Sequence, residues 1–392
     1  MLVLLSSTQT SAQPLVYVAS RDPGVDTVTV VDATTNRVAT TIAVGQPNAI
    51  ASSPDGTRVY VTSFNTMRVE AIDAVANRVV GAAVVGDKPE GIGVTPNGQF
   101  LYVANRTAGT VSVVDAGSDA AVGSIGVGAF PRGVAVSPDG RTVYVTNLNS
   151  STVSVIDTAT NTVRKTITVG TGPRGVVFTR DGARAYVANH GSGFLSIIDP
   201  TQDTVVGTIS VSSPDSIALS PDDQQAYVTS SDINAVSVVD LEARTVATTI
   251  AIGSDPQGIA MTADGATVYA ASLEPGAIYA IDTSSNRVVK AISVAAGARG
   301  VGIAQAVVAP ATSTPTATPS PTATPPPGPC VGDCDKDGRV SVDELVIGVN
   351  IALGIVAIDR CPQFDVDGSS TVSVDELVRS VNSALFGCIA VD

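Results

Sequence analysis

The stretch Ser137–Asn147, SPDGRTVYVTN, decides the fold because near copies of it recur along the whole first part of the chain. The tyrosine of this stretch returns every 41 to 43 residues, at Tyr17, Tyr60, Tyr102, Tyr144, Tyr186, Tyr227 and Tyr269. Aspartates recur in step with it, at Asp32, Asp73, Asp115, Asp157, Asp199, Asp240 and Asp282. A fixed period of this length indicates a repeat architecture of seven units.

Each repeat contains four short β segments. In the copy between Phe130 and Gly170 they read GVAVS, TVYVTN, TVSVID and KTITVG, alternating apolar with polar or small residues as half-buried strands do. The PDG between the first two segments predicts a tight turn in which glycine adopts a positive φ. The D-x-x-x-N between the third and fourth predicts a second turn, where aspartate bonds the backbone and asparagine adopts the left-handed region.

Four strands per unit and seven units predict a β-propeller, whose ring leaves only short protected edges. Before the first full repeat the chain offers LVYVAS, VTVVD and TTIAVG, so the innermost strand of that unit is missing. RGVGIA at Arg299–Ala304 matches this strand and nothing further. We therefore expect an all-β, seven-bladed propeller over 14–307 that closes by strand exchange between its two ends.

The YVTN and YVAN strings, with SPDG before them and V-x-V-I-D after them, resemble the YVTN family of seven-bladed propellers of surface-layer and other extracytoplasmic proteins. The resemblance covers about residues 15–304. It implies the same fold and an extracellular or cell-surface location. Because one fold hosts binding, structural and enzymatic roles, function has to be argued from a site.

Composition limits the classes of partner. The 392 residues carry 36 acidic and 22 basic side chains without a basic stripe, which excludes a nucleic-acid footprint. The sequence has no uninterrupted apolar run of about 18 residues, so no membrane span is predicted. Residues 1–13, MLVLLSSTQTSAQ, resemble a truncated signal peptide that lacks its positive start. Residues 308–329 form a Pro/Thr-rich linker.

All four cysteines fall in the C-terminal segment 330–392: Cys330, Cys334, Cys361 and Cys388. This grouping is typical of a disulfide-braced exported domain, and three pairings are open. A zinc site is the alternative interpretation, but the segment has no CxxC pair.

The same segment contains two EF-hand calcium loops. DCDKDGRVSVDE begins at Asp333, and DVDGSSTVSVDE begins at Asp365. Their spacing converges six to eight oxygens on one Ca²⁺ ion. The predicted ligands are Asp333, Asp335, Asp337, Arg339 through its carbonyl, Ser341 and Glu344, and then Asp365, Asp367, Ser369, Thr371, Ser373 and Glu376. The second loop replaces the usual glycine by Ser370, so we expect it to bind Ca²⁺ more weakly.

An amphipathic helical pattern with an i, i+4, i+7, i+8 face follows each loop, beginning at Leu345 and at Leu377. Loop and exit helix, used twice, resemble the type I dockerin module, which implies a small α-helical calcium-loop domain and a cohesin-like or surface-protein partner. In that family, loop positions 10 and 11 help to select the cohesin. The matching residues here are Val342, Asp343, Val374 and Asp375.

The recurring residues of the propeller are interpreted as scaffold, so its function is expected where the blades differ. The residue after the proline of G-x-x-P varies most, and the loop after the second strand carries the only histidine, His190. We expect both positions at one mouth of the channel. Arg132, Arg174, His190 and Arg299 are thus the predicted site for an anionic ligand or glycan. The alternative interpretation pairs the arginines of adjacent blades with Glu90 and Asp215.

With a single histidine and no histidine–carboxylate constellation, the sequence predicts no catalytic residues. The resulting expectation is a non-enzymatic, exported propeller that binds a protein or polymer and is docked through its calcium module. Two alternatives stay open: a propeller enzyme of the lactonase or lyase type, and a purely structural surface-layer protein.

Overall fold

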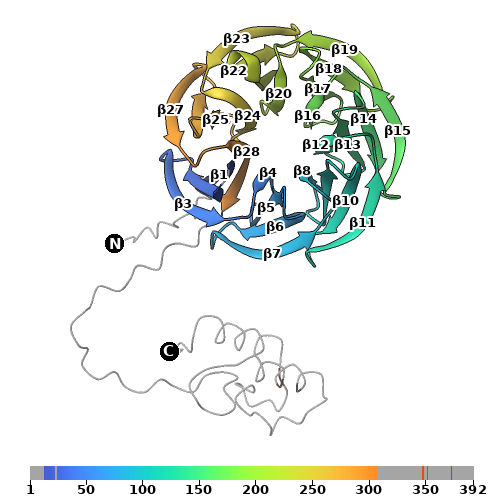
Figure 1. Ribbon diagram of the computed structural model, residues 1–392, viewed down its shortest axis with the longest axis vertical. Helices are drawn as coiled ribbons and strands as arrows, with labels where there is room; N and C mark the ends of the chain where they lie inside the picture. Colours follow the sequence, from blue (N-terminus) through green and yellow to red (C-terminus); the bar gives the residue numbers. More distant parts are fainter. Residues whose placement is uncertain (1–12, 23, 307–346, 348–350, 352–371, 373–392) are drawn as a thin grey trace, which may run out of the picture. The chain divides into compact units, whose positions relative to one another are not determined.

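The computed structural model describes residues 13–22 and 24–306, together with the single residues 347, 351 and 372. Over 13–306, 28 strands form seven four-stranded antiparallel sheets around a central channel (Figure 1). This confirms the predicted all-β, seven-bladed propeller. Apart from Gln13 and the three single residues, the predicted signal peptide, linker and α-helical calcium-loop domain, with their cysteines and calcium ligands, lie outside the described residues.

The blades are numbered along the chain, and the strands of each are given from the channel outward. Blade 1 consists of β28 (Ala298–Ala306), β1 (Gln13–Asp22), β2 (Val25–Asp32) and β3 (Arg37–Ala43). Blade 2 consists of β4 (Pro47–Ser52), β5 (Arg58–Ser63), β6 (Arg68–Asp73) and β7 (Arg78–Val84). Blade 3 consists of β8 (Pro89–Val94), β9 (Phe100–Asn105), β10 (Thr110–Asp115) and β11 (Ala120–Gly126).

Blade 4 consists of β12 (Pro131–Val136), β13 (Thr142–Asn147), β14 (Thr152–Asp157) and β15 (Thr162–Thr168). Blade 5 consists of β16 (Pro173–Phe178), β17 (Ala185–Asn189), β18 (Phe194–Asp199) and β19 (Thr204–Ser210). Blade 6 consists of β20 (Pro214–Leu219), β21 (Gln225–Ser230), β22 (Ala235–Asp240) and β23 (Thr245–Ala251), with a 3₁₀ turn η1 (Ser231–Ile233). Blade 7 consists of β24 (Ser254–Met261), β25 (Thr267–Glu274), β26 (Ala277–Asp282) and β27 (Arg287–Ser293).

Blade 1 closes the ring. Its innermost strand β28 pairs antiparallel with β1, and Leu15 lies opposite Ala304. Two ends of the described chain, almost 300 positions apart in sequence, therefore complete one sheet, as the match of RGVGIA to a first strand predicts.

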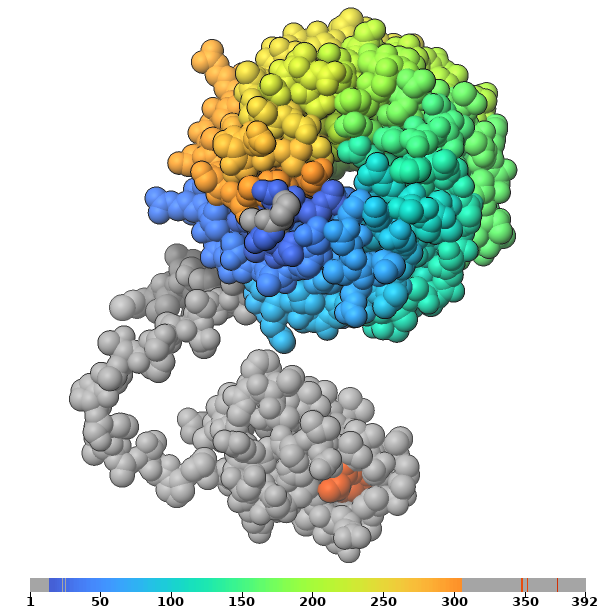
Figure 2. Space-filling model, viewed as in Figure 1, coloured from blue at the N-terminus to red at the C-terminus, as the bar shows by residue number. Residues whose placement is uncertain are grey.

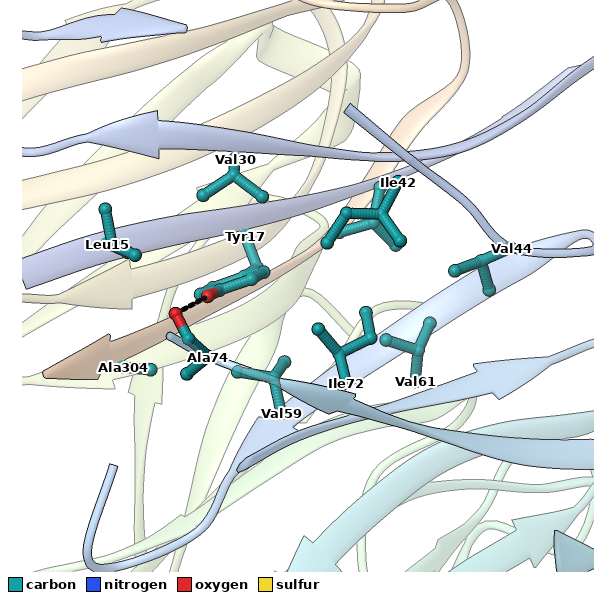
Figure 3. Close-up of a cluster of buried hydrophobic side chains, with 11 residues drawn as sticks. Leu15, Tyr17, Val30, Ile42, Val44, Val59, Val61, Ile72, Ala74 and Ala304 are labelled. Carbon is teal, nitrogen blue, oxygen red and sulfur yellow. Dashed lines mark hydrogen bonds between the residues drawn. The ribbon is translucent and has the colours of Figure 1, made fainter. Parts of the chain in front are cut away.

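The core lies between neighbouring blades. Figure 3 shows the cluster between blades 1 and 2, in which Val30 and Ile42 of one sheet face Val59 and Ile72 of the next. The two middle strands of a blade are buried on both faces, whereas the outer strands bury little more than one side chain each. Small β-branched side chains suit this layered packing because they fill the gap between two closely stacked sheets.

The recurring turn residues behave as their chemistry predicts. Gly140 of the PDG turn has a φ of 72°, and Asn161 of the D-x-x-x-N turn has a φ of 52°. The Oδ1 atom of Asp157 accepts the backbone N–H groups of Ala159 and Thr160 at 2.8 and 3.1 Å. These residues are scaffold, because each satisfies the backbone of its own turn.

The YVTN tyrosine connects neighbouring blades. The hydroxyl of Tyr227 in blade 6 donates a 2.7 Å hydrogen bond to Oδ1 of Asn286 in the D-x-x-x-N turn of blade 7. Tyr17, Tyr102 and Tyr269 make the same bond to Asn77, Asn161 and Asn36. At Tyr186 the corresponding turn position carries Arg244, and no hydrogen bond from its hydroxyl is found within the described residues.

We expect Tyr227→Phe to lower the free energy of unfolding by about 1 kcal/mol, because the change removes one hydrogen bond between blades and leaves the Oδ1 atom of Asn286 without it. Chemical denaturation monitored by circular dichroism would measure the loss. Tyr186→Phe is the matched control and should change stability by clearly less. Equal losses in the two variants would contradict this role of the hydroxyl.

The threonine and glycine of the repeat fix the innermost strands. The Oγ1 atom of Thr146 in blade 4 donates a 2.6 Å hydrogen bond to the carbonyl of Arg174 in blade 5. A Cβ atom added to Gly133 would lie 2.2 Å from the same carbonyl oxygen, so only glycine permits this approach of the two strands. Both contacts hold the backbone of the residue that faces the channel.

Candidate functional site at the channel mouth

Two loops of every blade meet at one end of the channel. The turn leading into the innermost strand hydrogen bonds the residue that follows the second strand: Arg106 N–H donates to Lys88 O at 3.0 Å, and His190 N–H donates to Gly172 O at 3.1 Å. The sequence-based expectation that these loops share one face is thus the observed arrangement. Figure 2 shows the channel as the hollow at the centre of the ring. Its mouth encloses a cavity of about 550 Å³.

Three consecutive residues of each innermost strand line this cavity, and the first of the three, at the position after the proline or its equivalent, is charged or polar. In ring order these first residues are Arg299, Asn48, Glu90, Arg132, Arg174, Asp215 and Gln257. Arg21, near the end of β1 in blade 1, and Arg106, directly after β9 in blade 3, complete the charged lining. Five arginines therefore face two carboxylates, and the mouth is cationic.

Asp215 is the anchor of the cationic side. Its side chain is almost fully buried, and it accepts a hydrogen bond from Nη2 of Arg132 at 3.1 Å and another from Nη1 of Arg174. Arg132 reaches past blade 5 to make this contact, whereas Arg174 belongs to the blade next to Asp215. A charge-assisted pair of this kind fixes both guanidinium groups in orientation.

Glu90 holds the other side of the mouth. Its Oε1 atom accepts a 3.0 Å hydrogen bond from Nη1 of Arg106, and its Oε2 atom lies 3.9 Å from Nε of Arg132. The alternative interpretation from the sequence, in which Arg132 and Arg174 pair with Glu90 and Asp215, is thus the arrangement found. Arg132 contacts both acids, and Arg174 contacts Asp215.

Two of the five arginines at the mouth, Arg21 and Arg299, have no carboxylate partner within the described residues. Nη1 of Arg299 donates to the neutral side-chain oxygen of Gln257 at 3.1 Å, while Nε of Arg299 and Nη1 of Arg21 are buried without a partner. Burial lowers the pKa of Arg21 to about 10, with a further contribution from Arg299, and burial also lowers the pKa of Arg299. Such cations favour the arrival of an anion, because it would supply both the missing charge and the missing acceptors.

Aromatic rings orient three of the cations. The guanidinium carbon of Arg21 lies 4.0 Å from the ring centroid of Phe64, and Nζ of Lys88 lies 5.8 Å from the same centroid. The guanidinium carbon of Arg106 lies 5.2 Å from the centroid of Phe130. These cation–π contacts hold the side chains in place but do not neutralise them.

The backbone at the mouth is strained in a regular way. The residue before the proline or its equivalent always has a positive φ, between 41° and 74°: Gln46, Lys88, Phe130, Gly172, Ser213, Asp255 and Gly297. Only two of these are glycine, the residue that adopts this conformation at no steric cost. Because this backbone conformation recurs in all seven blades, as it does in the D-x-x-x-N turns, it belongs to the scaffold that leads into each innermost strand.

His190 lies at the rim of the mouth, and its side chain does not line the cavity. Its Nε2 atom is 3.0 Å from the hydroxyl of Ser231 in the next blade. Burial and the charge of Arg174 lower the pKa of His190, while Asp215 and Asp232 act in the opposite direction. The imidazole is therefore neutral at neutral pH.

Of the four predicted ligand residues, the structure places Arg132, Arg174 and Arg299 around one cavity and His190 at its rim. Sequence reasoning did not assign Arg21 and Arg106 to the site. Both stand four residues after the tyrosine of their repeat, as His190 does, so the repeat register was the signal that could have identified them. Over 13–22 and 24–306, no three His, Cys, Asp or Glu side chains come together as a metal centre. The same described residues contain no helix that is long and apolar enough to cross a membrane.

Comparison with protein families gives one match. Residues 15–124 and 68–168 match the family described as lactonase, seven-bladed β-propeller. These ranges cover blades 1 to 4, apart from β28. No curated protein matches the chain.

Many solved structures share the fold. Hydrazine synthase of Kuenenia stuttgartiensis is 23% identical with a TM-score of 0.60, over 65% of this chain and 89% of that one. A functionally unknown protein from Desulfotomaculum acetoxidans is 17% identical with a TM-score of 0.65, and the match covers 74% of this chain and 99% of that one. The dihydro-heme d1 dehydrogenase NirN, in complex with DHE, is 16% identical with a TM-score of 0.56, and the match covers 76% of this chain and 77% of that one. At these identities the likeness concerns the fold.

The prediction of a non-enzymatic binding propeller, docked through its calcium module, is wrong in the light of the lactonase match. The error has a physical origin. The prediction rested on the single histidine and on the missing histidine–carboxylate constellation, but a propeller assembles its mouth from residues about 42 positions apart, so the sequence does not show which catalytic groups meet there. The enzyme alternative is the interpretation that the family match favours.

Proposed function

We propose that this protein is a lactonase-type propeller enzyme that hydrolyses a cyclic ester carrying an anionic group, bound in the cavity of the channel mouth. The observation that carries the proposal is the cavity lining of five arginines and two carboxylates, with buried guanidinium N–H groups of Arg21, Arg174 and Arg299 left without partners. The family match supplies the reaction class.

The chemistry of ester hydrolysis suits such a lining. Attack on the carbonyl carbon of a lactone places negative charge on the carbonyl oxygen, and preorganised donors in a partly buried site stabilise that charge. Ring opening then yields a hydroxy acid, whose carboxylate is also an anion. Asp215 and Glu90 are assigned to orientation of Arg132, Arg174 and Arg106, whereas Arg21 and Arg299 are assigned to the anionic group of the substrate.

A lactone panel tests the proposal. The full chain would be assayed by proton release at constant pH on lactones of matched ring size, with and without a carboxylate or phosphate substituent. We expect turnover, with the anionic members preferred. Absence of turnover on every member by a correctly folded protein would overturn the proposal, and equal rates on charged and neutral members would overturn its anionic component.

We further propose that 330–392 binds two Ca²⁺ ions and that the protein is extracytoplasmic. The two loops with position 12 occupied by Glu344 and Glu376, and the four cysteines confined to the same segment, support both statements.

Glu344→Gln should weaken calcium binding more than Glu376→Gln. A bidentate carboxylate at position 12 closes the coordination sphere, and the first loop has one more carboxylate and a glycine at position 6. Calorimetric titration of the full, disulfide-intact chain with Ca²⁺ would measure both variants. Absence of binding below the millimolar range, or the reverse order of the two losses, would contradict the assignment.

A further inference from the structure

We infer that Ser231 and His190, which lie at the rim of the cavity and not in its lining, form a nucleophile–base pair, and that a substrate bound in the mouth opens by acyl transfer to the hydroxyl of Ser231 when its ester reaches this rim. The inference rests on the proposed ester hydrolysis and adds the attacking atom and its base. It starts from one contact between neighbouring blades, the 3.0 Å separation of His190 Nε2 and Ser231 Oγ.

The repeat places these two side chains at equivalent positions. His190 follows β17 of blade 5 and Ser231 follows β21 of blade 6, where the other blades carry Arg21, Phe64, Arg106, Leu148 and Leu273. Both residues are half-buried and thus open to a ligand in part. Among the seven equivalent positions, this pair alone joins a hydroxyl to a base.

The carboxylates of the mouth are engaged elsewhere. Both oxygens of Asp215 accept hydrogen bonds from arginines, and Oε1 of Glu90 accepts one from Arg106. His190 is the one histidine of the 392-residue chain, and its ring contacts a hydroxyl rather than an acid. A neutral imidazole within hydrogen-bond reach of a hydroxyl is the arrangement that activates serine nucleophiles.

The surroundings of His190 favour its neutral imidazole, which is the form that can accept a proton from a hydroxyl. Burial lowers the pKa of His190, with further lowering by Arg174 and Arg132, while Asp215 and Asp232 raise it. Three of these four charged groups line the cavity, so the pair lies within the electrostatic field of the mouth. Arg174 also has a buried Nε atom without a partner, which makes it a candidate donor to a developing oxyanion.

The reaction balances without a cofactor. His190 Nε2 takes the proton of Ser231 as Oγ bonds the lactone carbonyl carbon, and the ring C–O bond breaks while the imidazolium returns the proton to the leaving alkoxide. Water, deprotonated by the same nitrogen, then attacks the acyl ester. The hydroxy acid leaves, and Oγ regains its proton.

Covalent labelling tests the inference independently of any substrate. The full chain would be treated with a fluorophosphonate serine probe, and the site of modification mapped by mass spectrometry. We expect one label on Ser231, none in Ser231→Ala, and a labelling rate about 100-fold lower in His190→Gln. The wild-type rate should fall with decreasing pH as the imidazole becomes protonated, at a pKa lower than that of a free imidazole.

Ser150→Ala is the matched control, because that hydroxyl lies in the corresponding loop of blade 4 and accepts a backbone N–H instead of contacting a histidine. It should label as the wild type does. An unlabelled wild-type protein, or a label on another serine, would overturn the nucleophile–base pair. Circular dichroism of each variant checks that the fold is retained.

Lactone turnover separates this inference from the proposed function. A fall of about 10³-fold or more in kcat for Ser231→Ala supports both. Unchanged turnover in Ser231→Ala overturns the serine nucleophile and leaves the lactonase proposal standing. A labelled Ser231 with no turnover on any lactone supports the activated pair and overturns the lactonase proposal.

Discussion

Replacement of Asp215 by alanine is expected to lower the free energy of unfolding by about 3–5 kcal/mol, because it removes one partner of a buried ion pair and leaves the other charge uncompensated. Asp215 is 2% exposed and accepts hydrogen bonds from both Arg132 and Arg174. Without it, two guanidinium groups from different blades would face each other and Arg299 in a cavity that already has an excess of positive charge.

Denaturant unfolding of the wild type and of Asp215→Ala would measure this loss. Asp26→Ala is the control, because Asp26 is exposed and accepts its hydrogen bond from Gln46 at the surface. Its stability should stay within about 0.5 kcal/mol of the wild type. A change of the same small size in Asp215→Ala would show that the mouth arginines need no anchor, and would contradict the role assigned to this carboxylate.

Arg299→Gln and Arg21→Gln are expected to reduce kcat/KM for anionic lactones by about 10- to 150-fold each. A hydrogen bond to a charged group contributes about 1.5–3 kcal/mol, and both side chains hold donors that await an acceptor. Rates on neutral lactones should change little, because these substrates have no anionic group for the two arginines to bind. Glutamine keeps a polar side chain of moderate length and removes the charge.

Initial-rate kinetics on paired charged and neutral lactones would give the two ratios. Arg37→Gln, an exposed arginine on the outer strand β3, is the control and should leave both rates unchanged. If Arg299→Gln and Arg21→Gln slow charged and neutral lactones equally, the arginines do not contact the anionic group. Added sulfate should compete with anionic substrates in the wild type and less so in these variants.

Local chemistry in the sequence was sufficient for the scaffold. Period-2 alternation sets each strand, and turn residues such as Gly140 and Asn161 adopt the left-handed backbone that their position requires. The tyrosine spacing predicted seven blades, and the unmatched strand at Arg299–Ala304 predicted that it completes the first blade and closes the ring. Each of these features depends on residues within one repeat, or on the comparison of one repeat with the next.

The repeat register also brought the correct positions to one face, and three of the predicted arginines line one cavity. Sequence reasoning missed Arg21, although the register marks its position, because only the loops that follow asparagine were compared and the loop of blade 1 follows Ser20. Nor did it show that the Tyr227 hydroxyl and Thr146 connect one blade with the next.

The sequence by itself therefore determined the blade number, the strand order, the ring closure and the set of variable positions at the mouth. Only the tertiary structure decided which of those positions interact. Besides Glu90 on an adjacent blade, Arg132 contacts Asp215, which is 83 positions away in the sequence and two blades away in the ring. The reason is geometric: local propensities fix each strand, whereas the radius of the closed ring and the reach of each side chain fix which charges meet across it.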